Sequence, residues 1–268
     1  MSCPDCTTGA NLPGTPKGVL KDDGSYFAAA PEGGEGSEHK RAVLLLTDAF
    51  GLGLDNPKIM ADYFAEQLHC DVWVPDIWAG KPLVKESELK LPEKAGEKIG
   101  FLGWSRFYMT MLPKIGKIIS NRPSVVDKRI KNFINKIKAD NKYENMGAVG
   151  YCFGGACCAR LAATDAVDTV VICHPGNFSL KLIDKFIIPV SFVCAEDDFT
   201  FPTAKRQKAE RLLAQRAKDD KRGVEYEFQD YKGTVHGFAA RPNTQLPEIK
   251  EAFEKSLEQT VSWFKKRL

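Results

Sequence analysis

The segment 150–155, which reads GYCFGG, restricts the fold of this 268-residue chain more than any other. It joins a short apolar run, 147–149, to a stretch of small residues, 156–163, that is typical of a tightly packed helix. The residue at the apex of such a turn has strained backbone angles, so the positions two before and two after it must be small. Both positions are glycine. The pattern therefore predicts a strand, a sharp turn and a helix, with Cys152 exposed at the apex.

Strands and helices alternate along the rest of the chain. A continuous apolar run, as at 42–46, is typical of a strand buried on both faces of a parallel sheet. The predicted strands cover 42–46, 71–75, 147–149, 169–173, 190–194 and 224–228, with short strands around Val19 and Tyr26. The predicted helices cover 57–68, 124–138, 156–163, 203–217 and 247–264. This alternation predicts an α/β fold with a mostly parallel central sheet flanked by helices.

The chain shows no internal repeat, low-complexity tract or linker, so we expect 1–268 to form a single domain. Residues 1–39, rich in glycine, proline, serine and threonine, are expected to form an N-terminal arm. The region 79–122 contains several prolines and glycines and an aromatic-rich stretch. We expect it to form helical cover and one wall of a binding cleft.

The composition argues against several classes of function. Basic and acidic residues nearly balance, at 38 and 35, so nucleic acid is not expected as a partner. A secretory signal and an apolar run of about 20 residues are both lacking, so we expect no membrane partner and a cytoplasmic location. In that reducing compartment the eight cysteines are expected to be thiols.

The cysteines give little evidence of a bound metal. Cys3 and Cys6 form a single pair, whereas structural zinc usually needs four ligands, so we expect no metal and no cofactor. Five other cysteines lie near predicted strands or on the predicted 156–163 helix, and we expect them to behave as small buried hydrophobic residues: Cys70, Cys157, Cys158, Cys173 and Cys194.

Cys152 is the candidate nucleophile. The predicted turn places its sulfur at a helix N-terminus, whose positive end favours the thiolate. A short motif can arise by chance, so an ordinary glycine-rich turn with a buried cysteine is the competing interpretation. The turn is typical of the α/β-hydrolase fold, in which the catalytic residues follow the order nucleophile, acid, histidine.

A nucleophilic cysteine needs a base, and only His174 and His236 follow Cys152. His236 lies between the last predicted strand and the final helix, where this fold places its catalytic base. His174 follows the elbow too closely, and we expect it to be a hydrogen-bonded structural histidine. His39 and His69 precede the elbow and are interpreted as surface or packing residues.

The acid that orients the base should follow the strand at 190–194, where Glu196, Asp197 and Asp198 lie. We prefer Asp198, because it begins a turn that leads into the next helix, and Asp197 remains an alternative. Two backbone amides could stabilise an oxyanion. The first belongs to Phe153, directly after the nucleophile, and the second to Ala49, in the loop after the first strong strand.

On these residues the chain resembles the dienelactone hydrolases (carboxymethylenebutenolidases), especially their eukaryotic branch, including fungal members. The resemblance spans about 40–265 and rests on five segments: Asp48-Ala49-Phe50-Gly51, Pro75-Asp76, Gly150-Tyr151-Cys152-Phe153-Gly154-Gly155, Asp198 with Pro202, and His236-Gly237-Phe238 followed by Arg241. A tyrosine and a cysteine before the paired glycines make the elbow specific, since most members of the fold use serine there.

The resemblance implies a triad of Cys152, His236 and Asp198, with an oxyanion hole formed by the amides of Phe153 and Ala49. It also implies substrate and gating residues. Asp48 occupies the place of an acidic residue that interacts with the resting cysteine until substrate binding frees the thiolate; bacterial relatives carry glutamate there. Arg241 is a candidate to bind an anionic substrate, and Trp104 and Arg106 are candidate contacts in the aromatic-rich stretch.

The leading hypothesis is a cysteine-dependent hydrolase that cleaves a small lactone or ester, of the dienelactone type, through an acyl-enzyme. One alternative is a thioesterase or esterase for another small acyl substrate. A hydrolase-fold binding protein without catalysis is a second alternative, and a thiol-based redox or metal protein built on Cys3 and Cys6 is a third.

Overall fold

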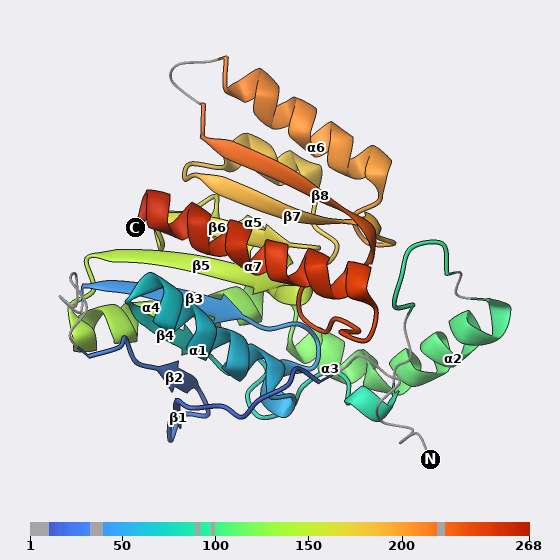
Figure 1. Ribbon diagram of the computed structural model, residues 1–268, viewed down its shortest axis with the longest axis horizontal. Helices are drawn as coiled ribbons and strands as arrows, with labels where there is room; N and C mark the ends of the chain where they lie inside the picture. The colour runs from blue at the N-terminus through green and yellow to red at the C-terminus, as the bar shows by residue number, and fades with distance from the viewer. Residues whose placement is uncertain (1–10, 33–39, 89–91, 98–99, 219–222) are drawn as a thin grey trace.

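The computed structural model describes residues 11–32, 40–88, 92–97, 100–218 and 223–268. Its centre is one eight-stranded sheet with the order β1-β2-β4-β3-β5-β6-β7-β8 (Figure 1). The strands are β1 Val19–Leu20, β2 Tyr26–Ala28, β3 Arg41–Leu46, β4 Asp71–Val74, β5 Asn145–Tyr151, β6 Thr169–Cys173, β7 Val190–Asp197 and β8 Tyr226–Val235. All pairs from β4 to β8 are parallel, whereas β1 and β2 pair antiparallel at one edge. The predicted mostly parallel sheet is confirmed.

Helices cover both faces of the sheet. They are α1 Asn56–Leu68, α2 Phe101–Met111, α3 Ile115–Ser120, α4 Pro123–Asn141, α5 Phe153–Leu161, α6 Thr203–Arg216 and α7 Pro247–Arg267. Short 3-10 turns are η2 Gly51–Gly53, η3 Glu86–Glu88, η4 Leu112–Lys114 and η5 Leu180–Lys185. The helices α1 and α7 pack together on one face, and α4, α5 and α6 cover the other (Figure 1).

The sequence of β3 explains why both faces are covered. Its side chains alternate between two apolar cores, with Val43 and Leu45 facing α1 and α7, and Leu44 and Leu46 facing the other layer. All four are fully buried. A strand of this kind is stable only between two layers of helices, because either face would otherwise expose apolar surface to water.

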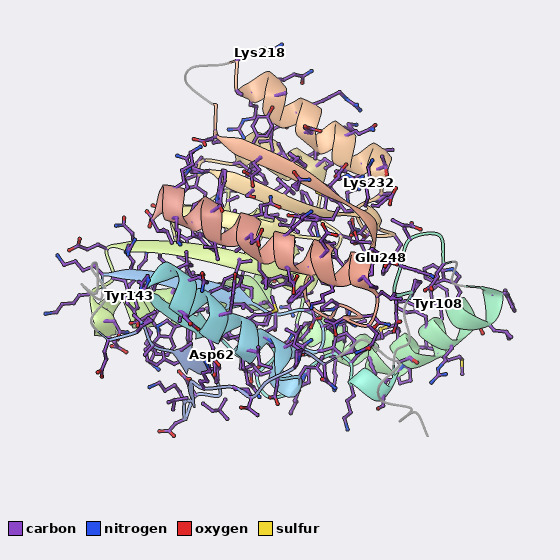
Figure 2. The ribbon with its side chains drawn as sticks, in the orientation of Figure 1. Asp62, Tyr108, Tyr143, Lys218, Lys232 and Glu248 are labelled. Carbon is purple, nitrogen blue, oxygen red and sulfur yellow. The ribbon has the colours of Figure 1, made fainter. Side chains whose placement is uncertain are left out.

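Hydrogen bonds attach the antiparallel edge of the sheet to the helix α1. The hydroxyl of Tyr26 in β2 donates to Asp62 Oδ1 of α1 at 2.7 Å, and the Lys17 amide donates to Asp62 Oδ2 at 2.6 Å (Asp62 is labelled in Figure 2). The short strands expected around Val19 and Tyr26 are therefore confirmed, and they extend the sheet by antiparallel pairing. Cys3, Cys6 and His39 lie outside the described residues.

The region 79–122 was expected to form helical cover, and only part of this expectation is confirmed. It contains the helices α2 and α3, but α2 buries none of its residues and stands out from the body of the sheet (Figure 1). Its inner side contacts the rest of the chain at a few points, among them Met111, which packs against a small cluster of Phe50, Leu54 and Val84. The helices were predictable from local sequence, whereas their position depends on the rest of the fold.

Candidate active site

The turn at Cys152 has the geometry that the glycine pattern predicts. Cys152 lies between β5 and α5 with a φ of 53° and a ψ of −110°, a strained conformation for a residue with a side chain. A Cβ at Gly150 would lie 2.2 Å from the Gly154 carbonyl oxygen, and one at Gly154 would lie 2.1 Å from the Leu46 carbonyl oxygen. Both glycines are therefore required by close backbone contacts, which hold the elbow against β3.

The chain after β6 holds the strained cysteine in place. The Cys152 amide donates to the Cys173 carbonyl at 3.1 Å, and the Gly176 amide donates to the Cys152 carbonyl at 2.6 Å. Both backbone groups of the apex residue are thus hydrogen-bonded to one short segment. A strained backbone conformation is stable only where the surrounding structure fixes it, as these two hydrogen bonds do at Cys152.

His236 and Asp198 form a buried pair directly beside the elbow. Nδ1 of His236 lies 3.0 Å from both carboxylate oxygens of Asp198. The side chains are 4% and 1% exposed, respectively, so water does not compete for this hydrogen bond. Cys152 lies near enough to the imidazole to be one of the groups that raise the pKa of His236. The structure thus brings the three predicted residues together in the order thiol, imidazole, carboxylate.

The choice between the two aspartates follows from the end of β7. Asp197 is still part of the strand, is exposed, and pairs with Val235 of β8. Asp198 is the first residue beyond the strand, and its side chain turns inward to His236. Glu196 accepts a hydrogen bond from the Gly233 amide at 2.6 Å and so holds the end of β8, which leads directly to His236.

Thr200 is a site residue that the sequence analysis missed. Its hydroxyl lies 2.7 Å from Asp198 Oδ1, 3.1 Å from His236 Nδ1 and 2.8 Å from the Pro175 carbonyl. The amides of Thr200 and Phe201 also donate to Asp198 Oδ1, at 2.8 and 3.0 Å. The turn 198–201 therefore orients the carboxylate, and an aspartate followed two residues later by a threonine was the available signal.

The electrostatics of the site follow from these contacts. Burial lowers the pKa of His236, but the charges of Cys152 and Asp198 outweigh it and raise this pKa to about 10. Burial raises the pKa of Asp198, yet the imidazolium and the hydrogen bonds from His236 and Thr200 hold it well below its ordinary value. Asp198 is thus a permanent anion that favours the protonated form of His236.

A second histidine, His174, packs against the first. The ring centroids of His174 and His236 are 5.1 Å apart, with their planes at 68°. His174 is fully buried, and within the described part of the chain neither of its ring nitrogens has a hydrogen-bond partner. Burial lowers the pKa of His174 to about 3, so its ring is neutral. The expectation of a hydrogen-bonded structural histidine is therefore wrong in this respect, because the ring packs among aromatic side chains.

Asp48 and Arg241 form an ion pair at the edge of the site. Nε of Arg241 donates to Asp48 Oδ2 at 2.9 Å, and the two side chains are 14% and 8% exposed. The other oxygen of Asp48 accepts a hydrogen bond from the Phe50 amide at 2.9 Å, and the guanidinium carbon lies 4.2 Å from the Phe50 ring centroid. These contacts fix both side chains although they are 193 residues apart in sequence.

The loop that carries Ala49 packs directly on the elbow. The Gly154 amide donates to the Thr47 carbonyl at 3.1 Å, and the ring of Trp78 lies 4.6 Å from that of Phe153. Phe153 is the first residue of α5, so its amide has no acceptor within the helix. The loop and the start of α5 therefore lie on the same side of Cys152.

Trp104 reaches the site through one intermediate ring. Its centroid lies 6.3 Å from that of Phe199, whose centroid lies 4.9 Å from that of His236. Phe199 is half-exposed and packs against His236. Arg106, two residues after Trp104, is exposed on α2.

Three further observations concern the chain as far as the structure describes it. No group of three or more His, Cys, Asp or Glu side chains there is arranged to hold a metal ion. No helix in the same residues is long and apolar enough to cross a membrane. The five cysteines expected to be buried are buried, and all five are free thiols.

Comparison with known proteins agrees with this geometry. Residues 27–268 match the dienelactone hydrolase family. The hydrolase tropI of Talaromyces stipitatus is 29% identical over 270 residues, which cover 98% of this chain and 95% of the relative. The hydrolase pyvD of Aspergillus violaceofuscus is 26% identical over 98% of this chain and 96% of its own length. The human carboxymethylenebutenolidase homolog is 23% identical over 84% of this chain and 82% of its own.

Solved structures of similar fold carry dienelactone hydrolase descriptions as well. A crystal structure described as a putative dienelactone hydrolase from Klebsiella pneumoniae superposes with a TM-score of 0.65, at 14% identity, over 90% of this chain and 91% of that one. At that identity the likeness shows the fold, which is the α/β-hydrolase fold. The family match covers all the predicted site residues. The chain therefore belongs to the dienelactone hydrolase family of ester and lactone hydrolases.

Proposed function

We propose that the protein hydrolyses a small carboxylic ester or lactone, of the dienelactone type, with Cys152 as the nucleophile and an acyl-enzyme as the intermediate. The observation that carries this proposal is the buried, hydrogen-bonded pair of His236 and Asp198 beside Cys152 at a strained elbow. A merely structural cysteine needs neither the strain nor a buried, oriented imidazole.

The reaction follows from the positions of the groups. His236, whose raised pKa favours the imidazolium, holds the proton of the Cys152 thiol, and the thiolate attacks the carbonyl carbon of the substrate. The amides of Phe153 and Ala49 stabilise the oxyanion, and the intermediate collapses to a thioester with release of the alkoxide as an alcohol, protonated by His236. In a lactone that alcohol stays attached to the acyl group. Water, activated by His236, then hydrolyses the thioester and regenerates the thiol.

The Asp48–Arg241 pair supports an anionic substrate. Arg241 uses Nε to bind Asp48, and its two terminal nitrogens remain the donors that match a carboxylate. A substrate carboxylate bound by these nitrogens would share the guanidinium with Asp48. Trp104 and Phe199 form the aromatic wall of the same site in this proposal.

The state of the cysteines supports a reducing location such as the cytoplasm. Every cysteine that the structure describes is a free thiol, including the pair Cys157 and Cys158 on α5. Reducing compartments keep thiols in this state, whereas oxidising ones favour disulfides.

The test is a panel of lactones, aryl esters and thioesters assayed with the wild type, Cys152→Ser and Cys152→Ala. The wild type should form an acyl adduct on Cys152 that is visible by intact mass, and Cys152→Ala should lose at least about 10³-fold in kcat. Cys70→Ala is the matched control, because Cys70 is also free but lies outside the site. Full turnover by Cys152→Ala would overturn the proposal, and the preferred leaving group in the panel separates lactonase from thioesterase.

A further inference from the structure

An unusually large apolar surface lies on the segment α2–η4–α3. Within the described residues twelve large hydrophobic side chains are exposed, and eight of them lie between 101 and 119. These eight, which we call the outer α2–α3 face, are Phe101, Leu102, Tyr108, Met109, Leu112, Ile115, Ile118 and Ile119. Their exposed fractions range from 43% to 86%. Tyr108 is labelled on α2 in Figure 2.

The helical period separates this face from the side that packs on the protein. Trp104, Phe107 and Met111 follow at spacings of three and four residues and are half-buried. Lys114 continues this inner side and forms an ion pair with Glu88. The inner side is therefore attached to the body of the protein, and the outer face points away from it.

The outer face carries one apolar row on each helix. Phe101, Tyr108 and Leu112 follow at intervals of seven and four residues along α2 and its C-cap, and Ile115 and Ile119 follow at an interval of four along α3. The two rows, which η4 separates, together form the seam. These positions contain no charged residue, although Arg106 and Lys117 lie beside them. A seam without charge fits contact with an identical seam, because a two-fold axis brings like residues towards like.

The size of the face also matches a subunit interface. At roughly 200 Å² for a large side chain with its backbone, the exposed fractions amount to on the order of 1,000 Å². The largest apolar patch of a typical monomer is about 300–600 Å². A stable interface buries about 800 Å² on each partner, so the outer face is large enough for one.

We propose that the outer α2–α3 face binds the same face of a second copy of this chain, and that the active protein is a homodimer. The contact also affects the site, because Trp104 on the inner side of α2 reaches His236 through Phe199. Dimerisation fixes α2, and α2 fixes the aromatic wall beside the catalytic histidine. The effect on catalysis rests on the proposed function, whereas the dimer itself does not.

The test is sedimentation over a wide range of protein concentration, on the wild type and a matched pair of variants. Leu112→Glu places a carboxylate on the outer face, and Leu20→Glu makes the same change on β1, where the residue is equally exposed at 63%. We expect a wild-type dimer, an unchanged Leu20→Glu dimer, and a dissociation constant for Leu112→Glu that is raised at least about thirtyfold. Circular dichroism confirms that both variants are folded.

A wild type that is monomeric at every concentration would overturn the proposal. So would a Leu112→Glu protein that dimerises as tightly as Leu20→Glu. An apolar face flanked by cations could also bind an anionic membrane surface, and sedimentation with vesicles of phosphatidylglycerol tests this alternative. A monomer that binds these vesicles through the outer face would replace the dimer with a membrane surface.

Activity gives the second readout. If the dimer fixes Trp104, kcat/KM of the wild type should fall on dilution below the dissociation constant, and Leu112→Glu should show that lower value at all concentrations. A Leu112→Glu protein that is monomeric and fully active would show that activity does not depend on the dimer. That result would overturn the proposed effect of dimerisation on catalysis. Cys152→Ala should lose activity and still sediment as a dimer. The proposed function and the dimer are therefore tested separately.

Discussion

His236 and Asp198 are joined by a hydrogen bond in which one imidazole nitrogen lies 3.0 Å from both carboxylate oxygens. Asp197, the neighbouring residue, belongs to β7 and is exposed. The pair of variants Asp198→Asn and Asp197→Asn therefore provides a matched test. Asp198→Asn should lower kcat by about 10³–10⁴-fold, as loss of the orienting carboxylate does in a serine triad, and Asp197→Asn should stay within about twofold. Equal losses in both variants would contradict the assignment.

Thr200 should contribute to activity by holding Asp198. The hydroxyl of Thr200 lies within 3.1 Å of Asp198 Oδ1, His236 Nδ1 and the Pro175 carbonyl. Thr200→Val keeps the shape and removes these hydrogen bonds, so we expect a loss of about 1–2 kcal/mol in unfolding free energy and a lower kcat. Thr200→Ser is the control and should recover most of both. A Thr200→Val protein with wild-type kcat would show that the backbone amides alone orient the carboxylate.

The raised pKa of His236 makes stability depend on pH on the alkaline side. This pKa is about 10 in the folded protein, compared with an ordinary value of 6.5 for an unfolded histidine. The folded state therefore holds a proton that the unfolded state loses, and the stabilisation is complete below about pH 6.5 and disappears as pH rises through about 10. Urea unfolding should show a falling midpoint over this range, and His236→Gln should flatten it. An unchanged slope in His236→Gln would assign the effect to other groups.

His174 should have the opposite dependence. Its pKa is about 3 when folded, so it stays neutral while the unfolded histidine gains a proton below about pH 6.5. This stabilisation is present above pH 6.5 and decreases as pH falls towards 3. His174→Phe and His174→Leu remove two buried nitrogens without partners and should raise the unfolding free energy by about 1–3 kcal/mol, more at acidic pH. His69→Asn, at an exposed position, is the control for urea unfolding at two pH values, and a destabilised His174→Leu would contradict the prediction.

Arg241 should select substrates by charge. Arg241→Gln removes the guanidinium beside Asp48, so KM for a lactone that carries a carboxylate should rise by about 10–100-fold. A neutral aryl ester should be affected much less, and the ratio of the two kcat/KM values is the measurement. If both substrates lose equally, Arg241 supports the site through Asp48 and does not bind the substrate directly.

The positions of the candidate residues were easier to predict from the sequence than their surroundings. Cys152, Asp198 and His236 were named as candidates because a nucleophile, an acid and a histidine must occur in a fixed order at the ends of successive strands, and the structure brings these three together. Thr200 was missed because a hydroxyl acts here only through the tight turn that folding creates. Asp48 and Arg241 were both named, but their ion pair links residues too far apart in sequence for any local pattern to show it.

The expectations that were wrong around the site also concerned tertiary contacts, which local sequence patterns do not show. His174 was expected to form hydrogen bonds because a buried polar group usually does, whereas the structure surrounds its ring with Tyr151, His236 and Phe238. The helices of 79–122 were expected to cover the sheet because amphipathic helices usually pack on their own domain. Which side of α2 faces the body depends on tertiary contacts such as that of Met111, and no local pattern shows these.

The contact of Gly154 with the carbonyl of Leu46 has a consequence for how this enzyme could be altered. Because the elbow and the end of β3 touch through backbone atoms, their close approach depends on the missing side chain of Gly154. Mutation can hardly tune it without breaking the fold. We expect diversification of substrate range to occur instead in 79–122, so exchanging that segment between relatives would transfer selectivity while the rate of the bond-breaking step stays nearly constant.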